Sequence, residues 1–142
     1  VAKKAHTYKS VTTKATLTKN GKVENKCSVC GNVKSTTTVY YPKTIKLSAT
    51  SYVYNGKKKT PSVTVKDSKG KALKKDTDYT VTYSSGRKSI GKYTVTVKFK
   101  GNYGGTEKLT FTIVPAIAAG LKGTTVSDSS VKLTWKVVYI TV

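Results

Sequence analysis

Residues 45–114 alternate between apolar and polar side chains one residue at a time, and this alternation constrains the fold most strongly. Every second residue is aromatic or aliphatic in the segments 79–83 (YTVTY), 93–99 (YTVTVKF) and 109–113 (LTFTI). Successive side chains of a β-strand point to opposite faces, so a period of two predicts strands with one buried face. Turns that contain glycine separate these segments. We therefore predict an all-β chain, with an antiparallel β-sandwich or barrel over residues 45–114.

The composition agrees with this fold class and excludes several others. Hydrophobic residues make up 37% of the 142 residues, and valine, tyrosine and threonine, which suit pleated surfaces, are frequent. No apolar run reaches the roughly 18 residues that a membrane-spanning helix needs, so no membrane insertion is predicted. One histidine, two cysteines and six carboxylates offer little material for an active site. We therefore predict a protein with no catalytic residues.

The charge is strongly positive and consists almost entirely of lysine. Lysine and arginine total 27 against 6 acidic residues, which gives a net charge of +21, and Arg87 is the only arginine. Proteins that read nucleic acids usually carry several arginines and cluster their charge, so no specific nucleic-acid partner is predicted. Two interpretations remain: lysines that solvate the outer strand faces, or attraction to anionic glycans or wall polymers.

Two short segments are candidates for binding such a polyanion. Lys57, Lys58 and Lys59 form a run that is either an exposed charged loop or a polyanion contact. Tyr103 lies in the glycine-rich segment 101–105 and is the best candidate for an exposed aromatic that stacks on sugars. The alternative for Tyr103 is that it fills a corner of the sandwich.

Residues 1–44 are predicted to form a separate, small β-meander. Asn20-Gly21 has the sequence of a two-residue hairpin turn, because both positions tolerate a positive φ. The flanking strands supply too little apolar mass for a good core. Segments of this size usually need a staple, a metal or a neighbouring domain to be stable.

Cys27 and Cys30 form a Cys-x-x-Cys-Gly motif within this first segment. The short loop lets two thiolates share one metal ion, and His6 is the only other soft ligand in the sequence. A zinc site at His6, Cys27 and Cys30 is one prediction. A Cys27–Cys30 disulfide in an oxidising, extracellular setting is a second, and free thiols are a third. A thioredoxin-like enzyme is not expected, because no helix or βαβ pattern accompanies the motif.

The C-terminal part is predicted to contain a linker and an incomplete domain. Residues 115–120 (PAIAAG) read as the linker, and residues 121–142 include an alternating segment with Leu133 and Trp135. The few strands that fit there cannot bury both faces of Trp135. The chain begins VAKKA without a visible signal peptide, so we expect an excised piece or a processed form.

Several segments resemble known bacterial modules. Residues 51–56 (SYVYNG), 78–83 (DYTVTY) and 91–97 (GKYTVTV) are similar to the repeated Ig-like modules of large secreted and surface proteins of Gram-positive bacteria. Residues 120–135 resemble the start of a fibronectin type III domain. The resemblance implies an Ig-like antiparallel β-sandwich over residues 45–114, followed by an incomplete fibronectin type III-like segment.

The first segment is similar to short cysteine-containing repeats of the same proteins. Their pattern is His-x-aromatic, then Ala-Thr-Cys, then Cys-x-x-Cys-Gly, and His6-Thr-Tyr8 and the motif at Cys27 and Cys30 fit it. Leu17 stands where the pattern has its first cysteine. By this resemblance, one potential metal ligand is absent from the chain.

These features together predict a structural role. The favoured function is a non-catalytic spacer or adhesion module of a multidomain cell-surface or secreted protein of a Gram-positive bacterium. Its partners would be other domains of the same parent chain. The alternatives are a polyanion- or glycan-binding module, an accessory domain of a secreted carbohydrate-active enzyme, and a filament subunit that self-associates by strand exchange.

Overall fold

The computed structural model describes residues 5–116, 122–127 and 130–134, the last two stretches by their backbone alone. Within these ranges the chain forms strands, turns and loops, and no helix that could cross a membrane is found there. The predicted all-β class is therefore confirmed. The strands in chain order are β1 (Tyr8–Thr13), β2 (Gly21–Cys27), β3 (Val33–Val39), β4 (Pro42–Leu47), β5 (Ser51–Val53), β6 (Val63–Asp67), β7 (Tyr79–Tyr83), β8 (Gly91–Phe99), β9 (Thr106–Val114), β10 (Lys122–Ser127) and β11 (Ser130–Thr134).

Strands β1, β2 and β3 form an antiparallel sheet, here called the first sheet. Its register places Tyr8 opposite Cys27 at one end and Gly21 opposite Val39 at the other. Side chains of β1 and β3 are exposed along nearly their whole length, so neither face of this sheet is covered. The first sheet consequently has almost no hydrophobic core of its own.

The connection between β1 and β2 differs from the predicted hairpin turn. β1 ends at Thr13 and β2 begins at Gly21, so residues 14–20 form a longer loop. The side-chain oxygen of Asn20 accepts a hydrogen bond from the backbone N–H of Tyr41 at 3.0 Å, while Gly21 already belongs to the ladder. The prediction of a two-residue turn at Asn20-Gly21 is therefore wrong, because the chain uses this loop to contact the next sheets.

Residues 42–114 form two further sheets that enclose the main core, here called the sandwich. One sheet contains β4 and β6, and the other has the order β5-β9-β8-β7. All of these pairs are antiparallel except β5–β9, which is parallel. The predicted alternation is confirmed, since most of the residues predicted to face inward on β8 and β9 are buried, and the others, Tyr93 and Leu109, are half-buried. The buried hydrophobic residues of the sandwich are Val65, Leu73, Tyr79, Val95, Val97, Phe99, Phe111 and Ile113.

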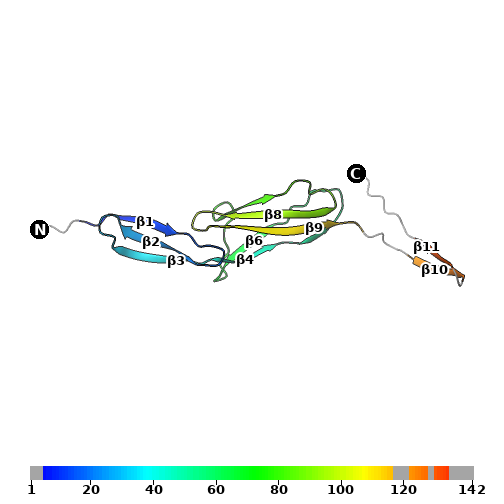
Figure 1. Cartoon of the computed structure of the whole chain (residues 1–142), viewed down its shortest axis with the longest axis horizontal. Helices are drawn as coiled ribbons and strands as arrows, with labels where there is room; N and C mark the ends of the chain where they lie inside the picture. The colour runs from blue at the N-terminus through cyan, green and yellow to red at the C-terminus, as the bar shows by residue number, and fades with distance from the viewer. Residues whose placement is uncertain (1–4, 117–121, 128–129, 135–142) are drawn as a thin grey trace.

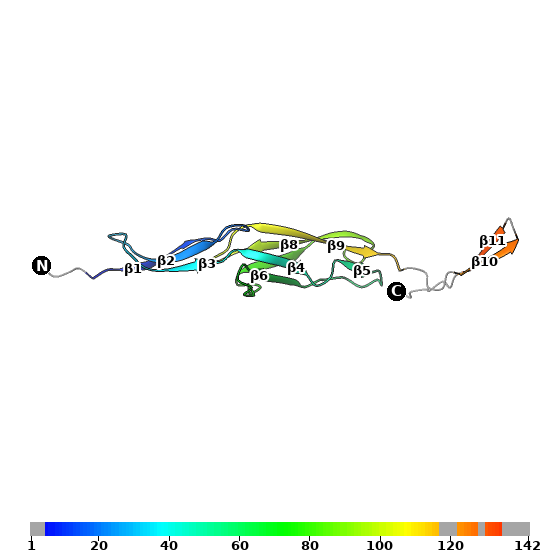
Figure 2. The ribbon, with the colours of Figure 1, turned by 90° about the horizontal axis from the view of Figure 1, so that it is seen from below.

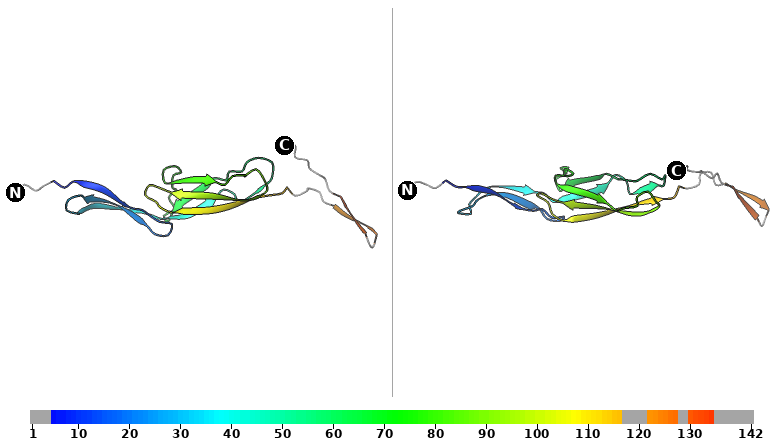
Figure 3. Two further views of the ribbon diagram at one scale, coloured as in Figure 1. Left: turned by 45° about the horizontal axis from the view of Figure 1, so that its top comes forward. Right: turned by 90° about the horizontal axis from the view of Figure 1, so that it is seen from above.

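The first sheet and the sandwich lie end to end along the long axis of the molecule. Figure 1 shows β1, β2 and β3 extending away from the sandwich in the same direction as β8 and β9 run. The views in Figure 2 and Figure 3 show the same extended arrangement from other sides. The two parts therefore meet only at one narrow end of each.

Strands β10 and β11 pair as an antiparallel hairpin. This hairpin falls within residues 121–142, for which a fibronectin type III-like segment is predicted. Trp135, on which that prediction depends, lies outside the described residues, as do residues 117–121. The fibronectin type III-like assignment and the domain boundaries accordingly stay predictions.

Candidate functional site

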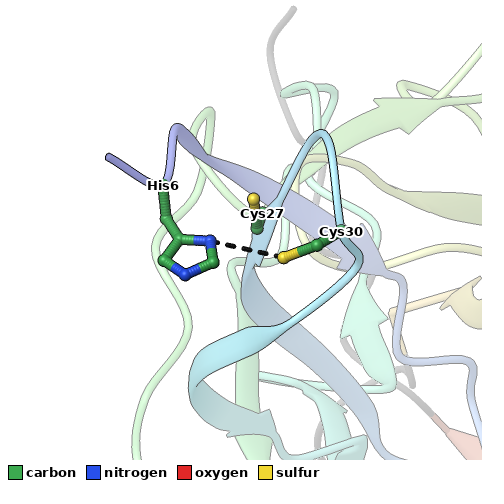
Figure 4. Close-up of side chains that lie close together, drawn as sticks. All are labelled: His6, Cys27 and Cys30. Atoms are coloured by element: carbon green, nitrogen blue, oxygen red, sulfur yellow. Dashed lines mark hydrogen bonds between the residues drawn. The ribbon is translucent and has the colours of Figure 1, made fainter. Parts of the chain in front are cut away.

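The structure brings His6, Cys27 and Cys30 together at the free end of the first sheet (Figure 4). Cys27 is the last residue of β2, Cys30 lies in the turn that leads to β3, and His6 precedes β1. The proximity follows from strand pairing, because Tyr8 lies opposite Cys27 in the β1–β2 ladder. The segment before β1 must therefore run alongside the turn after β2.

The three side chains form a compact cluster. Their ligand atoms all lie within 4.8 Å of one another, and Sγ of Cys30 is 3.3 Å from Nδ1 of His6. Cys27 is buried, whereas Cys30 and His6 are exposed, so the cluster opens to solvent on one side. Both cysteines are free thiols in the structure. Of the histidine, cysteine and acidic side chains among the described residues, only these three group in this way.

Backbone hydrogen bonds hold both segments in place without help from the cluster itself. The amide of Cys27 donates to the carbonyl of Asn32 at 2.7 Å, and the amide of Gly31 donates to the carbonyl of Cys27 at 3.1 Å. Gly31 has a φ of 75°, which glycine adopts at little cost in such a tight turn. On the other side, the amide of Ser28 donates to the carbonyl of Thr7 at 2.9 Å, which fixes the residue next to His6.

The thiol of Cys27 is acidic because its surroundings favour the thiolate. Backbone hydrogen bonds at Cys30 and Val29 lower the pKa of Cys27 from 9.0 to about 6, His6 contributes further, and burial opposes the change. The N–H groups of this turn stabilise negative charge on sulfur, as in other reactive cysteine loops. Near neutral pH, Cys27 is therefore expected to be a thiolate.

A pH titration of the metal-free, reduced protein tests this expectation. Thiolate absorbance in the far ultraviolet of the Cys30→Ser variant, in which Cys27 is the single thiol, should rise with a midpoint near pH 6. Because the folded pKa lies below the unfolded value, this group stabilises the fold fully above about pH 9, and the stabilisation is lost as the pH falls to about 6. A midpoint close to 9 in the folded variant would contradict the assignment.

Leu17 lies at the opposite end of the first sheet from this cluster. It follows β1 in the loop 14–20 and packs against the core group that contains Val97 and Phe99. The position where the cysteine-containing repeats have a further cysteine is therefore remote from Cys27 and Cys30. A side chain at position 17 could not join the cluster, because β1 runs away from the cluster over its whole length.

The loop 14–20 forms the second notable feature, the junction between the first sheet and the sandwich. The amide of Ala15 donates to the carbonyl of Asn102 at 2.9 Å, and the amide of Gly104 donates to the carbonyl of Ala15 at 2.8 Å. Ala15 is completely buried there and forms a β-bridge with Tyr103. The first sheet is thus attached to the sandwich twice, through this loop and through the chain between β3 and β4.

Sequence reasoning missed these junction residues. Ala15 is a small residue in a stretch of threonine and lysine, and Gly104 belongs to a glycine pair. Such small residues permit two backbones to approach closely, and that is the only signal the sequence offers. This signal does not identify Gly104, rather than another small residue, as the residue that pairs with Ala15.

Tyr103, predicted as an exposed aromatic, is half-buried at the junction. Its ring lies 6.4 Å from that of Phe99, and its backbone pairs with Ala15. Burial raises the pKa of its hydroxyl, and the charges of Asp78 and Asp67 raise it further. The expectation of an exposed stacking platform is therefore wrong, because the first sheet occupies the end of the sandwich where Tyr103 lies.

The lysines of the predicted polyanion contact are not equivalent. Lys57 and Lys58 are exposed, whereas Lys59 is half-buried, with its ammonium 2.8 Å from the side-chain oxygen of Asn55. The backbone of Lys59 also donates a hydrogen bond to the carbonyl of Arg87, before the start of β8. Tyr103 follows the end of β8, so the structure does not bring the three lysines and Tyr103 together.

No protein-family model, curated protein or solved structure matches this chain. Two features of the molecule therefore carry its functional interpretation. These are the junction at Ala15, which joins two β-units in line, and the cluster of His6, Cys27 and Cys30 at the far end.

Proposed function

We propose that the chain is a non-catalytic spacer module of a larger extracellular protein, which holds its neighbours apart at a fixed distance and orientation. The observation that carries the proposal is the double attachment at the junction. A single peptide connection between two β-units would act as a hinge. A second connection, at Ala15, opposes rotation about the first and makes the pair a stiff rod.

The side chains at the junction support stiffness as well. Leu17 contributes to the core group of the sandwich and lies against Gly105, where an added Cβ would come 3.2 Å from Cγ of Leu17. On the other side of the junction, the amide of Ser68 donates to the carbonyl of Tyr41 at 2.9 Å, next to the Asn20 contact. The hydrogen bonds at Ala15 and between Ser68 and Tyr41 join backbone to backbone without a flexible side chain, so they limit bending more than surface ion pairs would.

The proposal includes the finer fold assignment. Two packed sheets over residues 42–114, with turns at short intervals, support an Ig-like sandwich. Modules of this kind commonly serve as repeated units of extracellular proteins, and the lysine-rich outer strands would keep such a unit soluble and its sheet edges unpaired. Adhesion, glycan binding, an accessory role beside an enzyme, and strand exchange stay predictions of the sequence.

Residual dipolar couplings of backbone amides test whether the rod is stiff. In the wild-type full chain, couplings from β1–β3 and from β7–β9 are expected to fit one alignment tensor. The variant Leu17→Asp should need two tensors, because a carboxylate cannot replace an apolar group that packs on the core of the sandwich.

The variant Thr18→Asp is the matched control, because Thr18 lies in the same loop but is exposed. It should keep the single tensor of the wild type. If the wild-type couplings themselves required two independent tensors, the two units would be flexibly joined and the spacer proposal would fail.

A further inference from the structure

The cluster of His6, Cys27 and Cys30 has the donor set of a zinc site. Thiolate sulfur and imidazole nitrogen are the ligands that Zn²⁺ takes in structural sites. Two cysteines separated by two residues commonly supply half of such a set. In this chain the other donor comes from a segment 24 residues earlier than Cys30, so an ion would connect two separate parts of the first sheet.

The distances in the cluster match the size of the ion. With Zn–S near 2.3 Å and Zn–N near 2.0 to 2.1 Å, a tetrahedral ion holds sulfur and nitrogen roughly 3.5 Å apart. The separation of Cys30 Sγ and His6 Nδ1 is 3.3 Å, and the three ligand atoms lie within 4.8 Å of one another. Small movements of side chains, without movement of the backbone, would bring all three to bonding distance.

The site is also organised before any ion binds. The hydrogen bond from Ser28 to Thr7 holds the residue next to His6, and the turn around Gly31 fixes the two cysteines. The His6 ring also lies next to the ring of Tyr8, with 5.8 Å between the two centroids. Ligands that are already in place lose little conformational freedom on binding, so little binding free energy is lost in ordering them.

We propose that His6, Cys27 and Cys30 bind one Zn²⁺ through Nδ1 and the two Sγ atoms, with the fourth position open to solvent. On binding, both cysteines coordinate as thiolates, and any proton still on sulfur passes to the buffer. The two negative charges then balance the charge of the dication. No further histidine, cysteine or carboxylate of the described residues joins the cluster. A water molecule or a donor from a neighbouring domain therefore completes the coordination.

The ion would act as a staple for the part of the molecule that most lacks a core. The junction secures one end of the first sheet, and the ion would secure the other by joining the segment before β1 to the turn after β2. A ligand that binds only the folded form lowers the population of the open form by the factor 1 + L/Kd, where L is the free ligand concentration. At a free zinc concentration about 100 times the dissociation constant, amide hydrogen exchange in β1 and β2 should slow about 100-fold.

The test uses the full chain, freed of metal by a chelator and kept reduced. Titration with Co²⁺, a spectroscopic substitute for Zn²⁺, should produce thiolate-to-cobalt charge-transfer bands and strong visible bands of low-symmetry coordination, saturating at one ion per chain. Zn²⁺ should then abolish these bands by displacing the cobalt. Cys30→Ser and His6→Gln should weaken binding by at least about tenfold each, because even the loss of an outer-shell partner of a metal ligand typically costs that much affinity.

Both substituted side chains are exposed, so the variants are expected to fold, and their amide spectra will show whether they do. Asp76→Asn is the control, because it removes a carboxylate outside the cluster and should leave cobalt binding unchanged. The proposal is overturned if the reduced chain binds no cobalt, or if Cys30→Ser binds it as tightly as the wild type. It is also overturned if a Cys27–Cys30 disulfide, seen as a reductant-sensitive loss of two hydrogens in mass, persists when the protein is isolated with zinc present.

Discussion

The substitution Gly21→Ala is expected to disrupt the junction and to separate the motions of the first sheet from those of the sandwich. A Cβ at position 21 would lie closer than 3.0 Å to backbone atoms of Thr13, Lys14 and Ala15. Backbone atoms cannot rotate away as a flexible side chain can. The start of β2 and the loop 14–20 must therefore move apart, and Ala15 must leave its position beside Asn102 and Gly104.

We expect this substitution to lower the free energy of unfolding by about 3 kcal/mol, the upper end of the usual range for overpacking. Urea denaturation measures the loss, and residual dipolar couplings show whether the two units still share one alignment tensor. Gly104→Ala is the matched control, because Gly104 lies in the same junction and its nearest neighbours would be 3.8 Å or more from the new Cβ. A Gly21→Ala variant as stable as this control would show that the junction tolerates the displacement.

The sandwich was predictable from the sequence because its signal is local. In β8, Val95 and Val97 alternate with threonines, and the strand itself decides which face each side chain takes. Patterns of this kind need no knowledge of the rest of the chain, which is why strand positions in residues 45–114 were recovered.

The junction was not predictable, because its signal is not local. Asn20-Gly21 fits a tight turn by every local rule, yet contacts of Asn20 with Tyr41 and of Ala15 with Gly104 favour a longer loop. The energy that decides the conformation comes from residues far away in the sequence. The same is true of Tyr103, whose burial depends on a sheet formed by the first part of the chain.

The candidate metal ligands fall between these two cases. The Cys-x-x-Cys spacing identifies Cys27 and Cys30 as candidate ligands. His6 is a candidate because the sequence contains no other histidine or cysteine. That all three meet depends on the register that places Tyr8 opposite Cys27, which no short pattern contains. A register one residue different would turn Cys27 to the other face of the sheet and break up the cluster.

The substitution Phe111→Ala is expected to have the largest effect on stability of any in the sandwich. Phe111 is only 1% exposed, and its ring lies 5.8 Å from that of Tyr52 and 5.6 Å from that of Tyr93. Removing a buried phenylalanine leaves a cavity and typically costs about 3 to 5 kcal/mol. Small domains are stable by about 5 to 15 kcal/mol, so the variant should lose a large fraction of its free energy of unfolding.

The same variant decides whether the first sheet is an independent domain. Phe111 belongs to the core group on the side of the sandwich away from Leu17, so the substitution leaves the junction contacts themselves intact. The first sheet has little core, so it should unfold together with the sandwich at the same lowered urea concentration. Amide cross-peaks of β2 and β8, followed in one urea series, measure the two midpoints separately.

The control for this experiment is Val53→Ala, because Val53 is 57% exposed and its loss should move neither midpoint measurably. Coincident midpoints in Phe111→Ala would mean that the sandwich is the neighbour on which the first sheet depends. A first sheet that keeps its wild-type midpoint while the sandwich unfolds would instead be an autonomous unit. Repeating the urea series with zinc distinguishes stabilisation by the sandwich from stabilisation by the ion. An ion bound at the far end of the first sheet would raise the urea midpoint of β2 and leave that of β8 unchanged.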